Sequence, residues 1–253
     1  MTAIGNRGPR GAAPPGASGR GTRLVFVMLL LLGAFSAPAA GAADNTAAAL
    51  EAAGWSERSP GLLASLPPRT VEVRDSGIGG EFVLAPGTTL LWERLWKGGS
   101  GPGNVLEIEM FSEGMNLSSE DYLENGASFP VSVTAVFGRD SLDLPVKRRI
   151  LDFFAALYHG FRPGGIRLTY ATGHFAPVGS MYRLSDEETV FVLVGDEERG
   201  KTIAVRRDLA ADFRAAYGRD PRGPVTRLIV RAERPSREKG AIKAGVRVAF
   251  PGR

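Results

Sequence analysis

The stretch NVLEIEMF, Asn104–Phe111, alternates between apolar and polar side chains. Leu106, Ile108 and Met110 fall on one face of an extended chain, and two glutamates fall on the other. Because successive side chains of a β-strand point to opposite faces of its sheet, this alternation is typical of a strand between a core and water. It indicates a sheet that is buried on one face, as in an antiparallel sandwich.

Similar strand-like segments recur along the rest of the chain. They are rich in Val, Ile, Leu and aromatic residues, and Gly, Pro and Asp separate them, as is typical of β-strands and their turns. The further predicted strands are Thr70–Arg74, Glu81–Ala85, Thr88–Trp96, Pro130–Gly138, Gly165–Ala171, Thr189–Gly195, Thr202–Arg206, Thr226–Glu233 and Gly245–Phe250.

Two helices are expected among these strands. The first begins at Pro145, which suits the first helical position, and its apolar residues recur at helical spacing up to Gly160. The second follows Asp208, a good N-cap, and ends at Tyr217 before Gly218. Strands without regular β-α-β alternation predict a mostly β fold, an antiparallel β-sandwich of jelly-roll type with two short α-helices.

Residues 1–43 are predicted to be a signal peptide. A basic start without acidic residues precedes the apolar run LVFVMLLLLGAF, 24–35, and the small residues APAAGAA, 37–43, offer cleavage sites. The apolar run is shorter than the roughly 20 residues that span a bilayer, so cleavage is favoured over a permanent anchor. We expect a periplasmic or secreted protein that meets the membrane only transiently, through this leader.

The remaining chain divides into a lead-in and a domain. Pro60, Pro67 and Pro68 interrupt regular structure, so residues 44–69 are expected to be a mobile lead-in, although a short helix is expected over Ala47–Ala53. Residues 70–253 are then the β-sandwich domain. That length is sufficient for one well-buried core.

Composition excludes several classes of function. The chain has 31 Lys and Arg against 27 Asp and Glu, and four of the arginines lie in the leader, so the rest of the chain is balanced. A balanced charge predicts no nucleic-acid partner. The sequence has no cysteine, which excludes thiol nucleophiles, thiolate metal sites and disulfides.

The sequence GDEERGKT, Gly195–Thr202, matches the pattern of a phosphate-binding loop. Such a loop needs a helix that starts at its Lys-Thr pair, because the helix N-terminus binds the phosphate. Here the residues that follow Thr202 are strand-like, and three acidic residues occupy the loop. We therefore expect a charged hairpin loop, with no nucleotide.

Glu107 and Glu109 share one face of the opening strand and are the candidate catalytic residues. Carboxylates two residues apart on a strand lie about 6 to 7 Å from each other, which suits a glycosidase pair. The segment resembles the E-x-D-x-(x)-E signature of laminarinase-like glycosidases, which implies Glu107 as nucleophile and Glu109 as assisting acid. Two departures are the Glu at the middle position and Glu113, which comes one residue late. The alternative is a solvated strand face.

Trp92, Arg94 and Trp96 alternate along another strand. Two indoles beside a guanidinium on one face suit a platform on which a sugar ring stacks. The alternative is that the aromatic residues belong to the core, with the arginine at its rim.

A loop containing Glu120, Asp121 and Tyr122 is the second candidate contact with a ligand. Its acidic residues lack the spacing of a calcium loop, and the only histidines, His159 and His174, do not form a metal motif. We therefore predict no metal site and no cofactor.

The segment RRDLAADFRAAYG, Arg206–Gly218, resembles a pattern of domain of unknown function family 3047, a family of exported bacterial proteins without an assigned activity. The sequence Ser119–Tyr122 and the strand after it add to the resemblance, which covers about Leu90–Phe250. It implies a secreted sandwich similar to carbohydrate-binding modules. In place of the family's polar loop before the last strand, this chain has Arg234–Gly240, which removes support for a ligand site there.

Three hypotheses for function follow. The first is a non-catalytic β-sandwich that binds a glycan or another component of the cell envelope. The second is a glycoside hydrolase that uses the glutamate pair. The third is a structural or protein-interaction module of the envelope.

Overall fold

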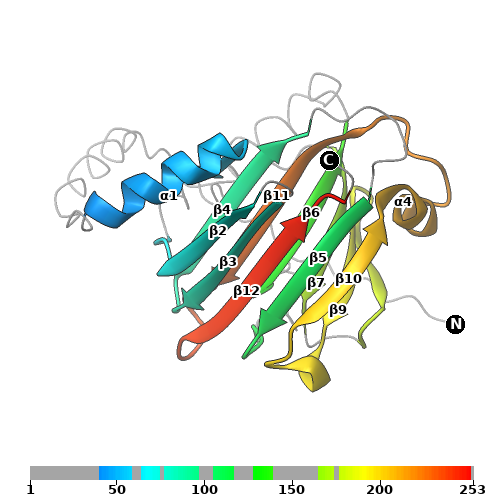
Figure 1. Ribbon diagram of the computed structural model, residues 1–253. Coiled ribbons are helices and arrows are strands. Elements are labelled where there is room, and N and C mark those ends of the chain that lie inside the picture. The colour runs from blue at the N-terminus through cyan, green and yellow to red at the C-terminus, as the bar shows by residue number, and fades with distance from the viewer. Residues whose placement is uncertain are drawn as a thin grey trace, which may run out of the picture. The chain divides into compact units, whose positions relative to one another are not determined.

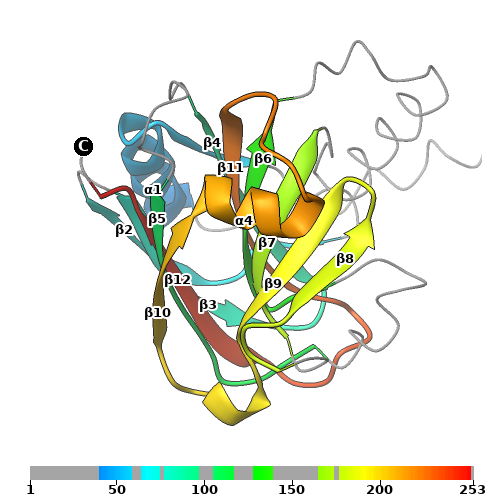
Figure 2. The same ribbon diagram turned by 90° about the vertical axis from the view of Figure 1, so that its right-hand side faces the viewer.

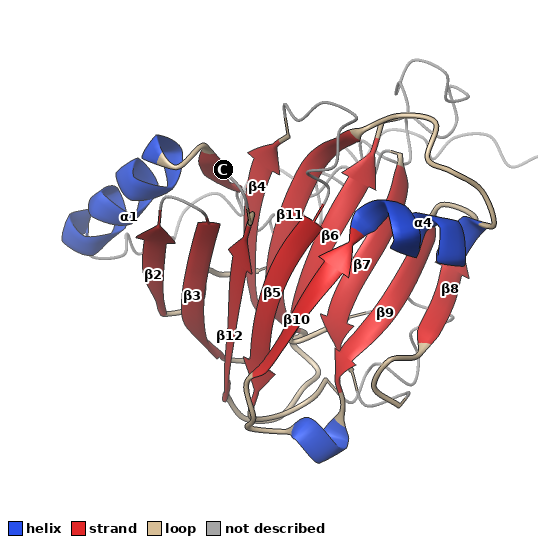
Figure 3. Ribbon diagram, turned by 45° about the vertical axis from the view of Figure 1, so that its right-hand side comes forward, coloured by secondary structure: helices blue, strands red, loops and turns tan. Residues whose placement is uncertain are grey.

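A computed structural model of the protein describes residues 40–58, 64–74, 77–96, 105–116, 128–138, 165–173 and 177–251. Within the compact unit 41–253, two sheets pack as the layers of a sandwich (Figures 1 and 3). The mostly β, jelly-roll type of sandwich predicted from the sequence is confirmed. Among the described residues, no helix is long and apolar enough to cross a membrane.

The larger sheet has seven strands and the smaller has five. In spatial order the larger sheet contains β1 (Trp55–Arg58), β4 (Thr88–Leu95), β11 (Val225–Arg234), β6 (Val131–Phe137), β7 (Ile166–Thr172), β9 (Glu188–Val194) and β8 (Met181–Ser185). The smaller contains β10 (Ile203–Asp208), β5 (Val105–Ser112), β12 (Ile242–Ala249), β3 (Gly77–Leu84) and β2 (Arg69–Arg74). Among the described strands, each neighbouring pair is antiparallel except β7 and β9, which run parallel.

The core lies between the two sheets and is apolar. Leu106, Ile108 and Met110 of β5 are buried in it, while the glutamates between them face outward, as the alternation predicts. Gly80 of β3 belongs to this packing, because a Cβ there would collide with Trp92 of the opposite sheet. The glycine therefore lets the two sheets approach each other where the Trp92 ring lies between them.

Two α-helices are described, α1 (Ala40–Ala52) and α4 (Leu209–Tyr217). For α4 both expected signals are present: the Asp208 carboxylate accepts from two backbone amides of the first turn, and Gly218 adopts a left-handed conformation with φ of 67°. The helix expected from Pro145 lies outside the described residues.

The expected lead-in contains ordered structure. β1 lies within it and pairs with β4 at the edge of the larger sheet. The side chain of Trp55 is only 1 % exposed and belongs to the main core. The domain therefore begins before residue 70.

A network of charges joins α4 to the sandwich. Arg207 donates from Nε and Nη2 to the Asp212 carboxylate over 2.9 and 2.6 Å, and the Tyr170 hydroxyl donates to the same carboxylate over 2.6 Å. Arg207 comes from β10, Tyr170 from β7 and Asp212 from α4, which lies beside these strands (Figure 2). Burial, followed by the charge of Asp212, raises the pKa of Tyr170 well above its usual range. We call these three residues the helix anchor.

Candidate functional site

The predicted aromatic platform faces the core. Trp92 is 0 % exposed and its Nε1 donates to Glu57 over 3.0 Å, while Trp96 is 8 % exposed and lies against Phe250 with ring centres 4.6 Å apart. Arg94 covers the same Phe250 ring from 4.8 Å. The three residues do share a face, but it is the inner face of β4. The platform hypothesis is therefore corrected, because neither indole offers an open surface for a sugar to stack on.

The second predicted contact, formed by Glu120, Asp121 and Tyr122, lies outside the described residues. The two histidines lie outside them as well. Within the described part of the chain, no three His, Cys, Asp or Glu residues gather closely enough to hold a metal ion.

The loop that resembles a phosphate-binding motif joins β9 of the larger sheet to β10 of the smaller sheet. A short 3-10 turn, Asp196–Glu198, occupies its first half, and β10 begins at Ile203. The Lys201 amino group donates to the backbone carbonyl of Glu197 over 3.0 Å. A strand rather than a helix begins directly after the Lys-Thr pair, as expected, but the connection crosses between the two sheets and so is not the expected hairpin.

A groove crosses the outer face of the five-stranded sheet. Its volume is about 330 Å³, and it extends from β2 through β3, β12 and β5 to the start of β10. The polar and aromatic side chains that line it are Thr70, Glu72, Glu81, Glu109, Phe111, Thr202 and Arg247. A concave surface with an aromatic ring and several polar groups has the features of a binding site.

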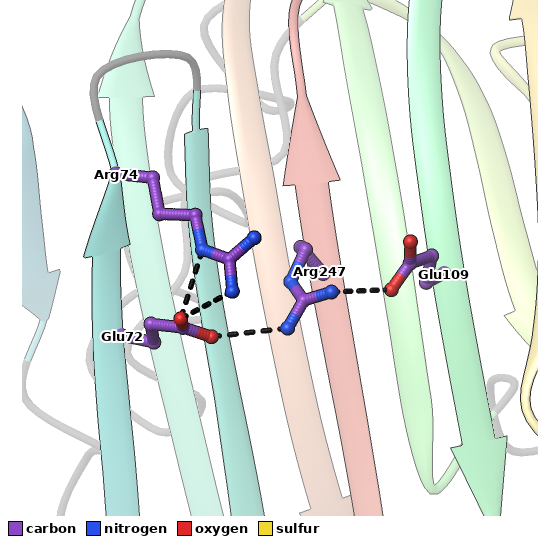
Figure 4. A network of polar contacts seen from close by, with 4 residues as sticks. All are labelled: Glu72, Arg74, Glu109 and Arg247. Carbon is purple, nitrogen blue, oxygen red and sulfur yellow. Dashed lines mark hydrogen bonds and ion pairs between the residues drawn. The ribbon is translucent and has the colours of Figure 1, made fainter.

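Arg247 is the centre of a row of ion pairs along this groove (Figure 4). Its Nη1 donates to Glu109 over 2.8 Å, and its Nη2 donates to Glu72 over 3.0 Å. On the other oxygen of Glu72, Arg74 donates from Nε over 2.8 Å. The row crosses the sheet from β2 to β5, and we call it the groove ladder.

A glycine lies beneath the centre of the groove ladder. In the register of the sheet, Gly79 of β3 is paired with Glu72 on one side and with Arg247 on the other. A Cβ at this glycine would lie 3.5 Å from Cγ and Nε of Arg247. The arginine thus passes over a strand that has no side chain there, and so reaches a carboxylate two strands away.

A second row runs beside the ladder and contains the aromatic ring. Phe111 of β5 lies over Gly245 of β12, where a Cβ would overlap the ring. Glu81 is paired with Gly245 in the register and with Thr70 on the far side. The floor of the groove therefore has a half-buried phenyl ring at one end, and a carboxylate and a hydroxyl at the other.

The ladder fixes the charges on this face. Hydrogen bonds from Arg74 and then from Arg247 lower the pKa of Glu72, so this carboxylate stays ionised. The hydrogen bond that Arg247 donates to Glu72, followed by the charge of Glu109, raises the pKa of Arg247. The side chain of Glu81 differs from those of Glu72 and Glu109, because within the described chain it has no hydrogen bond and no ion pair.

Only one residue of the candidate catalytic pair lies in the groove. Glu107 and Glu109 do share the outer face of β5, but only Glu109 lines the groove; Glu107 is paired in the register with Arg206 of β10. The same alternation places Phe111 two positions further on this face, and the sequence analysis did not select it. The ladder partners come from strands that are distant in sequence, so no local pattern indicates them.

The comparisons with known proteins concern the fold. No family model matches the chain, and no curated protein matches it, so the resemblance to family 3047 stays a prediction. Among solved structures, the catalytic domain of Humicola grisea Cel12A, in complex with a thio-cellotetraose, has 9 % identity and a TM-score of 0.40, over 78 % of this chain and 92 % of that one. The xyloglucanase domain of NopAA, a type three effector from Sinorhizobium fredii in complex with cellobiose, has 9 % identity and a TM-score of 0.33, over 76 % of this chain and 91 % of that one. At these values, the likeness carries no statement about a ligand of this chain.

Proposed function

We propose that this protein is exported through its N-terminal signal sequence and binds a glycan of the cell envelope without cleaving it. The groove of the five-stranded sheet is the binding site. The observation that carries the proposal is the half-buried ring of Phe111 over Gly245 on the groove floor. The polar side chains that line the groove lie around this ring.

The chemistry of the groove suits a sugar chain. A phenyl ring offers an apolar surface to the C–H face of a pyranose, while carboxylates, hydroxyls and a guanidinium bond to the sugar's hydroxyl groups. From β5 to β2 the groove crosses three strand spacings, about 14 Å. That length accommodates a short oligosaccharide that lies across the strands, and it exceeds a single sugar.

Binding without cleavage is favoured over hydrolysis by the state of the groove carboxylates. A glycosidase needs one carboxyl group whose pKa is raised so that it can donate a proton. Glu72 shows the opposite shift, because Arg74 and Arg247 lower its pKa. Glu109 is bonded to Arg247 and so is engaged in the ladder rather than directed at a substrate.

Titration calorimetry with soluble polysaccharide fragments tests the proposal. We expect one class of glycan to bind the wild-type protein and Phe111→Ala to weaken that binding at least about tenfold, which is about 1.4 kcal/mol. Phe111→Leu, which keeps an apolar side chain over Gly245, checks that the fold survives. Met181→Ala removes an exposed apolar side chain from edge strand β8 and is the matched control.

Two results would overturn the proposal. Release of reducing ends from the bound glycan, abolished in Glu109→Gln, would establish a hydrolase instead. A glycan panel without any binding, together with a protein partner captured by the groove face, would favour the interaction-module hypothesis.

A further inference from the structure

The groove indicates which class of glycan it accepts. Resting on the proposed function, we propose that the ligand is an amino glycan, with free amines on its sugar rings, and that Glu81 binds one of its ammonium groups.

The groove lining is acidic. It contains three carboxylates, Glu72, Glu81 and Glu109, and one guanidinium, Arg247; with Arg74, which bonds to Glu72 from beside the groove, three negative charges face two positive ones. Arg247 is already bonded to Glu72 and Glu109, so it has little capacity left for an anionic ligand. Such a surface repels uronic acids and phosphorylated sugars and attracts a cation.

Glu81 is the groove carboxylate that is available to a ligand. Its side chain is exposed, and within the described chain it has neither a hydrogen bond nor an ion pair, unlike the other two groove carboxylates. Its neighbour in the register is Gly245, over which the Phe111 ring lies, so the exposed carboxylate stands beside the ring. An ammonium that reaches this carboxylate gains a charge-assisted hydrogen bond.

The register also places the amine along the ligand. Phe111 lies on β5 and Glu81 on β3, and the Phe111 ring lies over Gly245, the residue of the intervening β12 that is paired with Glu81. The ring therefore reaches to within one strand spacing of Glu81, about 5 Å. The ammonium that Glu81 binds thus belongs to the sugar stacked on the ring or to the next unit along the groove.

The test uses three β-1,4-linked oligosaccharides of equal length that differ at carbon 2, bearing a hydroxyl, an acetamido or a free amino group. For the wild-type protein at low salt, we expect the amino oligosaccharide to bind about tenfold more tightly than the other two. Raising the salt concentration should reduce this preference, because the charges are near the surface. Glu81→Gln should weaken amino-oligosaccharide binding about fivefold, and Glu81→Lys should abolish it.

Glu113→Gln is the matched control. It removes the same charge from an exposed glutamate just beyond β5 that does not line the groove, so the preference for the amine should persist. Equal binding of the hydroxyl and amino oligosaccharides, dependent on Phe111 and insensitive to Glu81→Gln, would overturn the inference and retain glycan binding. Oligolysine binding as tightly as the amino oligosaccharide would also overturn it, because charge alone would then suffice.

Discussion

The helix anchor and the groove ladder are built from the same chemistry and differ in their surroundings. In the anchor, the side chains of Arg207 and Asp212 are 26 % and 13 % exposed. In the ladder, those of Arg247 and Glu109 are 38 % and 41 % exposed. Water screens the second pair more than the first, so the anchor should contribute more to stability, and the ladder to the properties of a surface. Similar ion pairs thus serve two roles in one domain.

The largest expected effect is on the anchor. Asp212→Ala leaves the Arg207 guanidinium and the Tyr170 hydroxyl without their shared acceptor, so we expect the free energy of unfolding to fall by about 3 kcal/mol. Urea unfolding measures this change. Asp220→Ala is the control, since it removes an exposed partner of Arg214 in an ion pair of the same region and should cost less than about 0.5 kcal/mol. Similar losses in both variants would contradict the comparison.

The next effect isolates the hydroxyl of Tyr170. Tyr170→Phe removes a hydrogen bond to a charged acceptor and should lower the free energy of unfolding by about 2 kcal/mol. Tyr217→Phe, which loses a bond to the backbone carbonyl of Arg167, should cost about 1 kcal/mol.

The stability of the protein at alkaline pH also depends on the Tyr170 hydroxyl. The folded state raises the pKa of Tyr170 above its value in the unfolded chain, so its contribution is complete below about pH 10 and is lost as the pH rises further. Urea unfolding across this range should show a loss of stability in the wild type that is smaller in Tyr170→Phe. Equal slopes in the two proteins would show that the phenol is not held by the anchor.

A smaller effect is expected in the ladder. Arg247→Met removes its central cation from a surface that water reaches, so the free energy of unfolding should change by less than about 1 kcal/mol. Glycan binding in the groove should change more than stability does. A loss as large as that of Asp212→Ala would mean that the ladder holds the sheet together, and the distinction between the two networks would fail.

The smallest effect is the acid dependence of Glu72. Arginine partners lower the pKa of this carboxylate in the folded state, so its contribution is present above about pH 4.3 and disappears as the pH falls below that value. Glu72→Gln should remove that part of the acid slope of stability. High salt should remove it from the wild type as well, because this carboxylate is exposed.

The strands could be predicted from the sequence because alternation is a local property. All ten predicted strands have counterparts, and β5 begins within a residue of its expected start. β3 begins four residues before the expected Glu81, since Gly77, Gly79 and Gly80 hide its start. Gly77 and Gly80 are required by contacts with other strands, because a Cβ would overlap the backbone of Val248 or the ring of Trp92, and no local rule reveals such contacts.

The candidate site could be predicted only in part. Alternation places Glu109 on the outer face of β5. For β4 it does not show whether the face with Trp92 is the buried one, because both faces of that strand are rich in large side chains. The ladder joins β2, β12 and β5, and the register between such distant strands is set by the whole sheet. Short edge strands such as β1 and β8 lack a long enough pattern to be recognised.

The order of the strands has a consequence for how the chain is made. The last two described strands, β11 and β12, lie inside the sheets: β11 between β4 and β6, and β12 between β5 and β3 (Figure 1). While the ribosome has not yet released Val225, the partners on both sides of these positions have open hydrogen-bonding edges. Neither sheet can close until β11 and β12 have been made, so a chain that stops before Val225 is exposed to aggregation.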